Sequence, residues 1–194
     1  MFTGIIETVG TVKEIKQEGS NKSFLIESTI SSRLKINQSV SHNGVCLTIV
    51  EVNGNCHRVT AVEESLQKTD LNNWSVGNKI NLERSMKLNS LVDGHLVQGH
   101  VDQTAICKLI EEKNGSHHFY FAFKKKANHI MIDKGSVTVN GISLTVVRCT
   151  KKKFTVAIIP YTFEHTNFSS LKKNDAVNIE FDVIGKYVEA LLKK

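Results

Sequence analysis

The chain contains one motif twice. The segment SVSHNGVCLTIV, residues 39–50, returns as SVTVNGISLTVV at residues 136–147. The alignment continues without a gap from residues 39–83 to residues 136–180, and 11 of these 45 positions are identical. A weaker match, GIIETVGTV from Gly4 with GHVDQTAIC from Gly99, has an offset of 95 residues instead of 97. Self-similarity at a fixed period indicates a duplicated structural unit.

Within each copy, short β-branched or alternating segments are separated by glycine, asparagine and serine, which is the pattern of strands joined by tight turns. Examples are GTVKEI, SFLIES, VCLTIVEV, HRVTAV and NKINLE. Asn-Gly pairs at Asn43, Asn53 and Asn140 predict tight turns, because both residues tolerate positive φ. Five or six strands in each copy predict a mainly β fold with two small closed barrels in tandem.

The predicted helices are short, except at the end of the chain. Brief helices fit residues 63–71, 125–132 and 162–171. In the tail the apolar residues follow helical spacing on one face; they are Ile184, Tyr187, Val188, Leu191 and Leu192. This stripe could pack against a barrel or against other subunits, and we favour the second. We therefore expect an N-terminal barrel at residues 1–92, a C-terminal barrel at residues 93–182 and an oligomerisation helix at residues 183–194.

Charge and cysteine content narrow the class of protein. The net charge of +6 comes mainly from short lysine clusters, without a nucleic-acid-binding motif or stacking aromatics, so we expect no nucleic acid as partner. The four cysteines have neither metal-site nor disulfide spacing, which is typical of a reducing cytosol. There is no signal-peptide pattern and no run of about 20 apolar residues. These features predict a soluble cytoplasmic protein without a membrane partner.

The differences between the copies point to chemistry. In the alignment of the two copies, Cys46 corresponds to Ser143, His42 to Val139, and His100 to Ile5. A single cysteine is more often a small buried hydrophobe than a nucleophile, because a reactive thiol needs an electropositive or base-bearing setting. His95 lies five residues before His100, but no further zinc ligands accompany the pair, so we expect no metal.

Seven motifs follow one another along the chain: MFTGII, SHNGVCLTIV, INLERSMKL, DGHLVQGHVD, KGSVTVNGISLTVV, IPYTFEHTNF and VNIEFDVIGKYVEALL. In this order they resemble riboflavin synthases of the alpha-chain type, a lumazine-binding family. The resemblance implies two six-stranded Greek-key-like β-barrels plus a C-terminal α-helix, assembled as a homotrimer with active sites between subunits. Lumazine synthase is a possible further partner.

The same resemblance implies a transferase that needs no cofactor. Two molecules of 6,7-dimethyl-8-ribityllumazine would exchange a four-carbon unit, giving riboflavin and 5-amino-6-ribitylamino-uracil in the last step of riboflavin biosynthesis. Two copies of a pocket would hold two copies of one substrate, one as donor and one as acceptor. The thiol in only one copy would mark the difference between the two roles.

By resemblance, Cys46 and His100 are the leading catalytic candidates, with Ser39 positioning the nucleophile or water and His95 in second rank. The N-terminal pocket would use Gly4, Ile5, Ile6, Cys46, Leu47, Thr48, Thr60 and Ser65, with Phe2 over or near the site. The C-terminal pocket would use Gly99, His100, Val101, Lys134, Ser143, Leu144, Thr145, Ile159, Pro160, Thr162 and Asp182. Thr60 stands where many members carry Asp, and Ser65 where many carry Thr. The Thr60 hydroxyl lacks the charge-assisted bond that a carboxylate would make.

Three other functions are compatible with parts of the pattern. The main alternative is a non-catalytic lumazine- or flavin-binding accessory protein, which needs the pocket but not Ser39, Cys46, His95 and His100. A flavin-dependent reductase would need a nicotinamide-binding domain, and the sequence has no GxGxxG motif. A purely structural assembly protein explains the repeat but not the histidines and the cysteine.

Overall fold

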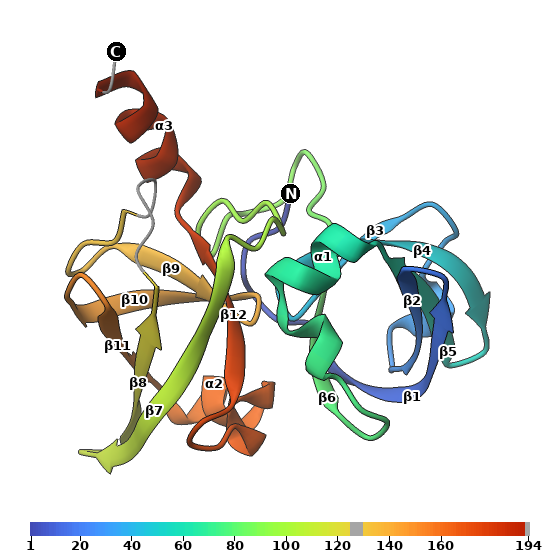
Figure 1. Cartoon of the computed structure of the whole chain (residues 1–194), viewed down its shortest axis with the longest axis horizontal. Coiled ribbons are helices and arrows are strands. Elements are labelled where there is room, and N and C mark those ends of the chain that lie inside the picture. Colours follow the sequence, from blue (N-terminus) through green and yellow to red (C-terminus); the bar gives the residue numbers. More distant parts are fainter. Residues whose placement is uncertain (125–129, 193–194) are drawn as a thin grey trace.

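The computed structural model describes residues 1–124 and 130–192. Each repeat forms one closed six-stranded antiparallel barrel, and the two barrels lie side by side (Figure 1). The first contains β1 (Thr8–Glu18), β2 (Asn21–Glu27), β3 (Ser39–His42), β4 (Val45–Asn53), β5 (Cys56–Ala61) and β6 (Lys79–Arg84). The second contains β7 (Gln103–Lys113), β8 (Ser116–Phe123), β9 (Ser136–Val139), β10 (Ile142–Cys149), β11 (Lys153–Ile158) and β12 (Ala176–Phe181). The tandem β-barrel prediction is confirmed.

The two barrels share their topology in detail. The strand order is β1-β2-β5-β4-β3-β6 in the first, and the corresponding strands pair in the same way in the second. A β-bulge after Val12 in β1 returns after Cys107 in β7, and one after Ile49 in β4 returns after Val146 in β10. Bulges bend strands at defined places, so their repetition shows that the duplication extends to local barrel curvature.

A short helical segment connects β5 to β6, and its equivalent connects β11 to β12. In the first barrel α1 (Glu63–Lys68) is followed by a 3₁₀ turn (Asp70–Asn73), and in the second α2 (Pro160–Glu164) is followed by another (Asn167–Ser170). The helices predicted at 63–71 and 162–171 are thus interrupted, because Thr69 and Thr166 adopt extended backbone and cap the following turn. The helix predicted at 125–132 falls mostly outside the described residues.

The two barrel interiors differ. The second is filled largely by phenylalanine, namely Phe119, Phe121, Phe123, Phe154, Phe168 and Phe181. The first instead encloses a chain of polar side chains. His42 Nδ1 donates to the Val40 carbonyl (3.0 Å), so its Nε2 accepts from His57 Nε2 (2.9 Å), and His57 Nδ1 accepts from the Ser31 hydroxyl (2.7 Å). Burial keeps both imidazoles neutral, holding the pKa of His42 well below its usual value and lowering that of His57 to about 4.

The barrels touch where the two Asn-Gly turns meet. A Cβ added to Gly44 would lie 2.8 Å from the Gly141 nitrogen, and one added to Gly141 would lie 2.8 Å from the Gly44 nitrogen. Both glycines also have positive φ. Two of the pairs predicted as tight turns, Asn43-Gly44 and Asn140-Gly141, therefore also form a close backbone contact between the barrels, where only glycine fits.

Buried amides extend this contact on both sides. The Asn178 side chain donates to the Asn43 carbonyl (2.9 Å), and the Asn81 side chain donates to the Asn140 carbonyl (3.0 Å). Within each barrel, a backbone N–H supports the same residues: that of Asn81 donates to Asn43 Oδ1, and that of Asn178 donates to Asn140 Oδ1 (2.8 Å each). Because equivalent residues make equivalent bonds, an approximate twofold axis relates the two barrels.

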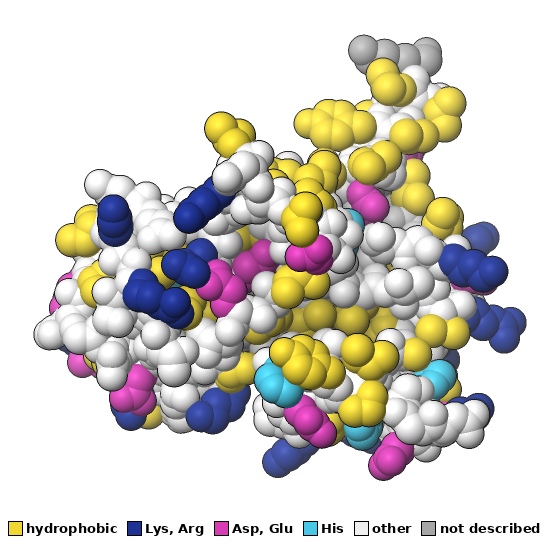
Figure 2. Space-filling view, turned by 180° about the vertical axis from the view of Figure 1, so that it is seen from behind, with side chains coloured by type: hydrophobic (Ala, Val, Ile, Leu, Met, Phe, Trp, Pro, Cys, Tyr) yellow, Lys and Arg dark blue, Asp and Glu magenta, His cyan; other side chains and the backbone are white. Residues whose placement is uncertain are grey.

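The predicted C-terminal helix is present as α3 (Val183–Leu192), which projects away from the second barrel (Figure 1). No residue of α3 is buried, and Figure 2 shows hydrophobic side chains gathered on it. Tyr187 is 68% exposed and Leu191 is 70% exposed. Within the described residues, no helix has the length and apolar character needed to cross a bilayer.

Candidate functional site

Two extended crossing segments, residues 2–6 before β1 and residues 97–101 before β7, run between the barrels. Phe2 pairs with Val97 as an isolated antiparallel bridge, which holds the segments side by side. The Gly4 carbonyl accepts the Ser143 N–H of the second barrel, and the Gly99 carbonyl accepts the Cys46 N–H of the first, both at 2.8 Å. Each repeat therefore lends its leading segment to the barrel of the other.

This exchange corrects the predicted composition of the pockets. Gly4, Ile5 and Ile6 were expected beside Cys46, but Gly4 lies against Ser143 and Ile6 packs on the core of the second barrel. Conversely, Gly99 lies against Cys46, and Val101 packs on the core of the first barrel. The grouping taken from the resemblance therefore differs from the contacts in the structure, because the crossing joins distant parts of the chain.

Both crossing segments need glycine at the point of contact. Gly4 and Gly99 each have φ of +79°. A Cβ on Gly4 would lie 2.6 Å from Ser143 Cβ, and one on Gly99 would lie 2.6 Å from Cys46 Cβ. The matching geometry confirms that Gly4 and Gly99 are equivalent, as the weaker sequence match with its offset of 95 indicated.

A buried glutamate fixes each segment. Glu180 on β12 accepts the backbone N–H groups of Gln98 (2.7 Å), Gly99 (2.9 Å) and His100 (2.9 Å). Its equivalent Glu83 on β6 accepts the N–H groups of Thr3 (2.7 Å) and Gly4 (3.0 Å) and the Thr3 hydroxyl (2.9 Å). Burial raises the pKa of both carboxyls, although the hydrogen bonds from these segments oppose that shift.

The Cys46 side chain lies on the outer face of the first barrel. Val40 pairs with Leu47, and both are buried in the interior, so the neighbouring pairs Ser41–Cys46 and Ser39–Thr48 face outward. Cys46 is partly buried and Thr48 is exposed. Thr60 on β5 and Ser65 on α1 are also partly exposed, and His100 is exposed beside Gly99. The first barrel thus presents a thiol and several hydroxyls on its outer face, and the crossing segment brings the His100 imidazole next to Gly99, which lies against Cys46.

The equivalent face of the second barrel places His95 against Ser143. His95 Nδ1 lies 2.6 Å from Ser143 Oγ, and its Nε2 lies 3.1 Å from Thr138 Oγ1. Burial lowers the pKa of His95, while the negative charge of Asp182 opposes this shift. The two histidines of DGHLVQGHVD therefore belong to different clusters, His95 with Ser143 and His100 with the segment beside Cys46.

The remaining predicted residues occupy varied positions. The side chains of Leu47 and Leu144 point into the barrel cores, which leaves only their backbone groups for a ligand. Phe2 was expected over or near the site; it is fully buried, and a Cβ on Gly99 would lie 2.9 Å from its ring, so Phe2 lies beside Gly99. Exposed or partly exposed positions are Ile5, Lys134, Thr145, Ile159, Pro160, Thr162 and Asp182.

Sequence reasoning missed Glu83 and Glu180 as parts of the site. Their identity in the two repeats was visible, and it was a usable signal, because few positions of the alignment are identical. Ser41 and Thr138 were also missed. Each pairs directly with the residue that differs between the repeats, Cys46 or Ser143.

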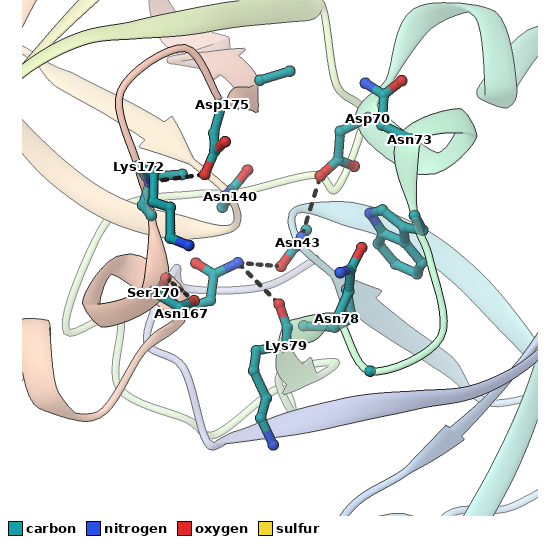
Figure 3. A pocket seen from close by; sticks show the side chains of 15 residues that line it. Asn43, Asp70, Asn73, Asn78, Lys79, Asn140, Asn167, Ser170, Lys172 and Asp175 are labelled. Atoms are coloured by element: carbon teal, nitrogen blue, oxygen red, sulfur yellow. Dashed lines mark hydrogen bonds between the residues drawn. The ribbon is translucent and has the colours of Figure 1, made fainter.

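A separate polar cleft of about 460 Å³ lies between the barrels (Figure 3). Asp70, Asn43, Asn140 and Asn167 line it, together with Trp74. Burial raises the pKa of Asp70 to about 6, although amide hydrogen bonds oppose the shift. Cys46 and Ser143 are not among its described lining residues. The cleft is therefore distinct from the two outer-face clusters, that is, the residues around Cys46 on the first barrel and those around Ser143 on the second. Among residues 1–124 and 130–192, no three His, Cys, Asp or Glu side chains are grouped to hold a metal ion.

The comparison with protein families agrees with this duplicated architecture. A family model described as "Lumazine binding domain" matches residues 3–85 and again residues 98–182, one match for each barrel. The chain belongs to the lumazine-binding domain family. Its curated relatives are named riboflavin synthase. The protein of Bacillus subtilis (strain 168) is 38% identical, covering 100% of this chain and 91% of the relative, and that of Escherichia coli (strain K12) is 33% identical, covering 94% and 87%.

A solved structure has the same fold. It is LumP complexed with 6,7-dimethyl-8-(1'-D-ribityl) lumazine, with a TM-score of 0.85 and 22% sequence identity, covering 93% of this chain and 98% of LumP. At this identity the likeness concerns the fold alone.

Proposed function

We propose that this chain is a riboflavin synthase, which converts two molecules of 6,7-dimethyl-8-ribityllumazine into riboflavin and 5-amino-6-ribitylamino-uracil. The observation that carries the proposal is the pair of equivalent outer-face clusters, of which only one has a thiol. The full-length similarity to proteins named riboflavin synthase supports it. Two related pockets suit two identical substrates, and their chemical difference suits a reaction in which those substrates play different roles.

The proposed reaction balances without an added oxidant or reductant, because the two products together contain all the atoms of two lumazines. A base removes a proton from the acidic C7 methyl group of one lumazine. A nucleophile adds to C7 of the other, and the resulting carbanion joins the activated ring before fragmentation releases the products. Correct orientation of two reactants contributes about 7–11 kcal/mol to such a step.

Cys46 and His100 would supply the nucleophile and the proton acceptor, with Ser39 positioning the nucleophile or water. Proton transfer by a positioned side chain typically contributes about 10²–10⁴-fold to the rate. The first pocket would comprise Ser39, Cys46, Thr48, Thr60, Ser65, Gly99, His100 and Val101. The second would comprise Gly4, Ile5, Ile6, His95, Lys134, Ser143, Thr145, Ile159, Pro160, Thr162 and Asp182.

The proposal includes the quaternary structure. Three copies would associate through the apolar face of α3, and the first pocket of one chain would meet the second pocket of another. This arrangement places the two lumazines face to face, which a shared active site requires. The enzyme would act in the cytoplasm, where lumazine synthase supplies its substrate.

The test is to mix purified protein with the lumazine, without metal or nucleotide, and to follow absorbance and product composition. We expect riboflavin and the pyrimidine in equal amounts. A lumazine that is tightly bound but spectrally unchanged over hours would instead identify an accessory binding protein. That is the second candidate, which the match of both barrels to the lumazine-binding domain family also supports.

A further inference from the structure

We propose that Glu180 is a positioning residue for Cys46 and His100, and that it acts through the backbone of residues 98–100. Its role in turnover rests on the proposed function, whereas its effect on the Cys46 thiol does not. Glu83 has the equivalent role for the cluster of Ser143 and His95.

Glu180 is suited to hold a loop in one place. It is 2% exposed, and its two carboxylate oxygens accept three consecutive backbone N–H groups at 2.7–2.9 Å. A carboxylate offers acceptors on both oxygens, whereas the amide of glutamine offers one oxygen and presents N–H donors at the other position. Glu180→Gln therefore leaves at least one backbone N–H facing another donor.

The held segment lies directly against Cys46. Gly99 accepts the Cys46 N–H at 2.8 Å, and its Cα has no room for a side chain beside Cys46 Cβ. The peptide is thus confined between Glu180 of the second barrel and Cys46 of the first. His100 is the next residue and shares the same carboxylate. One carboxylate consequently fixes both the peptide beside Cys46 and the backbone from which the His100 imidazole extends.

Glu83 provides an internal control. It is 4% exposed and accepts three bonds from Thr3 and Gly4, and Gly4 accepts the Ser143 N–H at 2.8 Å. Glu83→Gln therefore removes a similar set of interactions on the other side of the twofold axis. It does so beside a hydroxyl rather than beside Cys46.

The experiment compares Glu180→Gln with Glu83→Gln in the full chain. The rate of alkylation by iodoacetamide is measured on the peptide that contains Cys46, because Cys56 and Cys149 are also partly exposed. In Glu180→Gln we expect alkylation of Cys46 to become about 3- to 10-fold faster, since residues 98–100 are no longer held against Cys46. Riboflavin formation should fall about 10- to 100-fold in kcat, because a positioned proton transfer is lost. A thiol that is more accessible yet less effective indicates lost positioning.

In Glu83→Gln the alkylation of Cys46 should stay within about 1.5-fold of the unaltered protein, although the unfolding midpoint falls about as far as in Glu180→Gln. Equal acceleration in both variants would mean a general loosening and would overturn the proposal, as would unchanged alkylation in Glu180→Gln. If Glu180→Gln does not fold, Glu180→Asp, which withdraws the carboxylate by one methylene, should give the same changes at smaller size. If the unaltered protein forms no riboflavin, the proposed function fails, but the alkylation comparison still decides the role of Glu180.

Discussion

Asp70 and Asn167 occupy equivalent places across the contact between the barrels. The Asp70 N–H donates to Asn178 Oδ1, and the Asn167 N–H donates to Asn81 Oδ1, both at 2.7 Å. The Asn178 side chain donates to the Asp70 carboxylate (2.8 Å) as the Asn81 side chain donates to the Asn167 amide oxygen (2.9 Å). The same network thus holds a carboxylate on one side and a neutral amide on the other.

This asymmetry predicts a pH dependence of stability that a single substitution removes. The pKa of Asp70 is raised to about 6 in the folded protein from 3.8, so between these values the folded state binds more protons than the unfolded state. Its contribution to stability is present below about pH 4 and is lost as the pH rises through 6. Asp70→Asn removes the carboxyl, but its amide N–H then faces the Asn43 side chain, which donates to Asp70 Oδ2 (3.3 Å). The variant should therefore abolish a loss of about 2–3 kcal/mol in the free energy of unfolding between pH 4 and pH 7. Urea titrations at pH 4 and pH 7 measure the difference from the unaltered protein.

The matched control is Asn167→Asp, which places a second carboxylate in the equivalent environment. It should lower stability at pH 7 and have a much smaller effect at pH 4. An Asp70→Asn protein with the same pH dependence as the unaltered chain would mean that this carboxyl is not protonated near neutrality.

The histidine pair inside the first barrel predicts the opposite dependence on pH. Because the pKa of His57 is lowered to about 4 and that of His42 well below its usual value, the unfolded state binds more protons below about pH 6.5. Stability is thus lost as the pH falls toward 4. Replacing the pair by its equivalents in the second barrel, His42→Val with His57→Phe, should remove a loss of at least about 3 kcal/mol between pH 6.5 and 4, the share of His57 alone. Guanidinium titrations at several pH values test this, and equal acid sensitivity in both proteins would contradict it.

Cys46→Ser makes the first motif resemble the second. The barrel and pocket should persist, because serine fits the outward-facing position. Turnover should fall about 10²- to 10⁴-fold, the range for loss of a positioned catalytic group. Lumazine binding measured by fluorescence serves as the control. Full activity in this variant would show that the thiol is not used.

The exposed face of α3 predicts an effect on assembly. Tyr187→Glu with Leu191→Glu should leave both barrels folded, because no residue of the helix is buried against them. Sedimentation should show a smaller assembly, since the apolar face would no longer pack between subunits. Val76→Glu is the matched control, because Val76 is 65% exposed on the first barrel, away from the helix. An unaltered sedimentation coefficient in the α3 variant would refute an oligomerisation role.

The location of the complete active site is tested by complementation. Cys46→Ala disables the first pocket and Thr145→Trp blocks the second, so neither protein should form riboflavin alone. Co-refolded mixtures should regain activity, because some interfaces then join two intact pockets from different chains. Mass spectrometry confirms that mixed oligomers form. Inactive mixed oligomers would place the complete site within one chain.

Much of the fold was predictable from local patterns. The repeat, the alternating strands and the Asn-Gly turns indicated two small barrels, and the spacing of Ile184, Tyr187 and Leu191 indicated the terminal helix. These features depend on residues close in sequence, where periodicity and turn chemistry determine the backbone. The helix predicted at 63–71 was less accurate, because the capping role of Thr69 depends on its extended backbone.

The residues of the candidate site could be predicted from the sequence, but which of them lie together could not. Sequence comparison between the repeats determined that Cys46 and Ser143 are equivalent and chemically different, and that Glu83 and Glu180 are identical. Only the tertiary structure decided that Gly99 lies against Cys46 and Gly4 against Ser143. These contacts join segments about 50 or more residues apart, and they form only when both barrels are packed around their twofold axis. Local sequence carries no signal for such packing, since either barrel alone is compatible with a crossing segment on its own side.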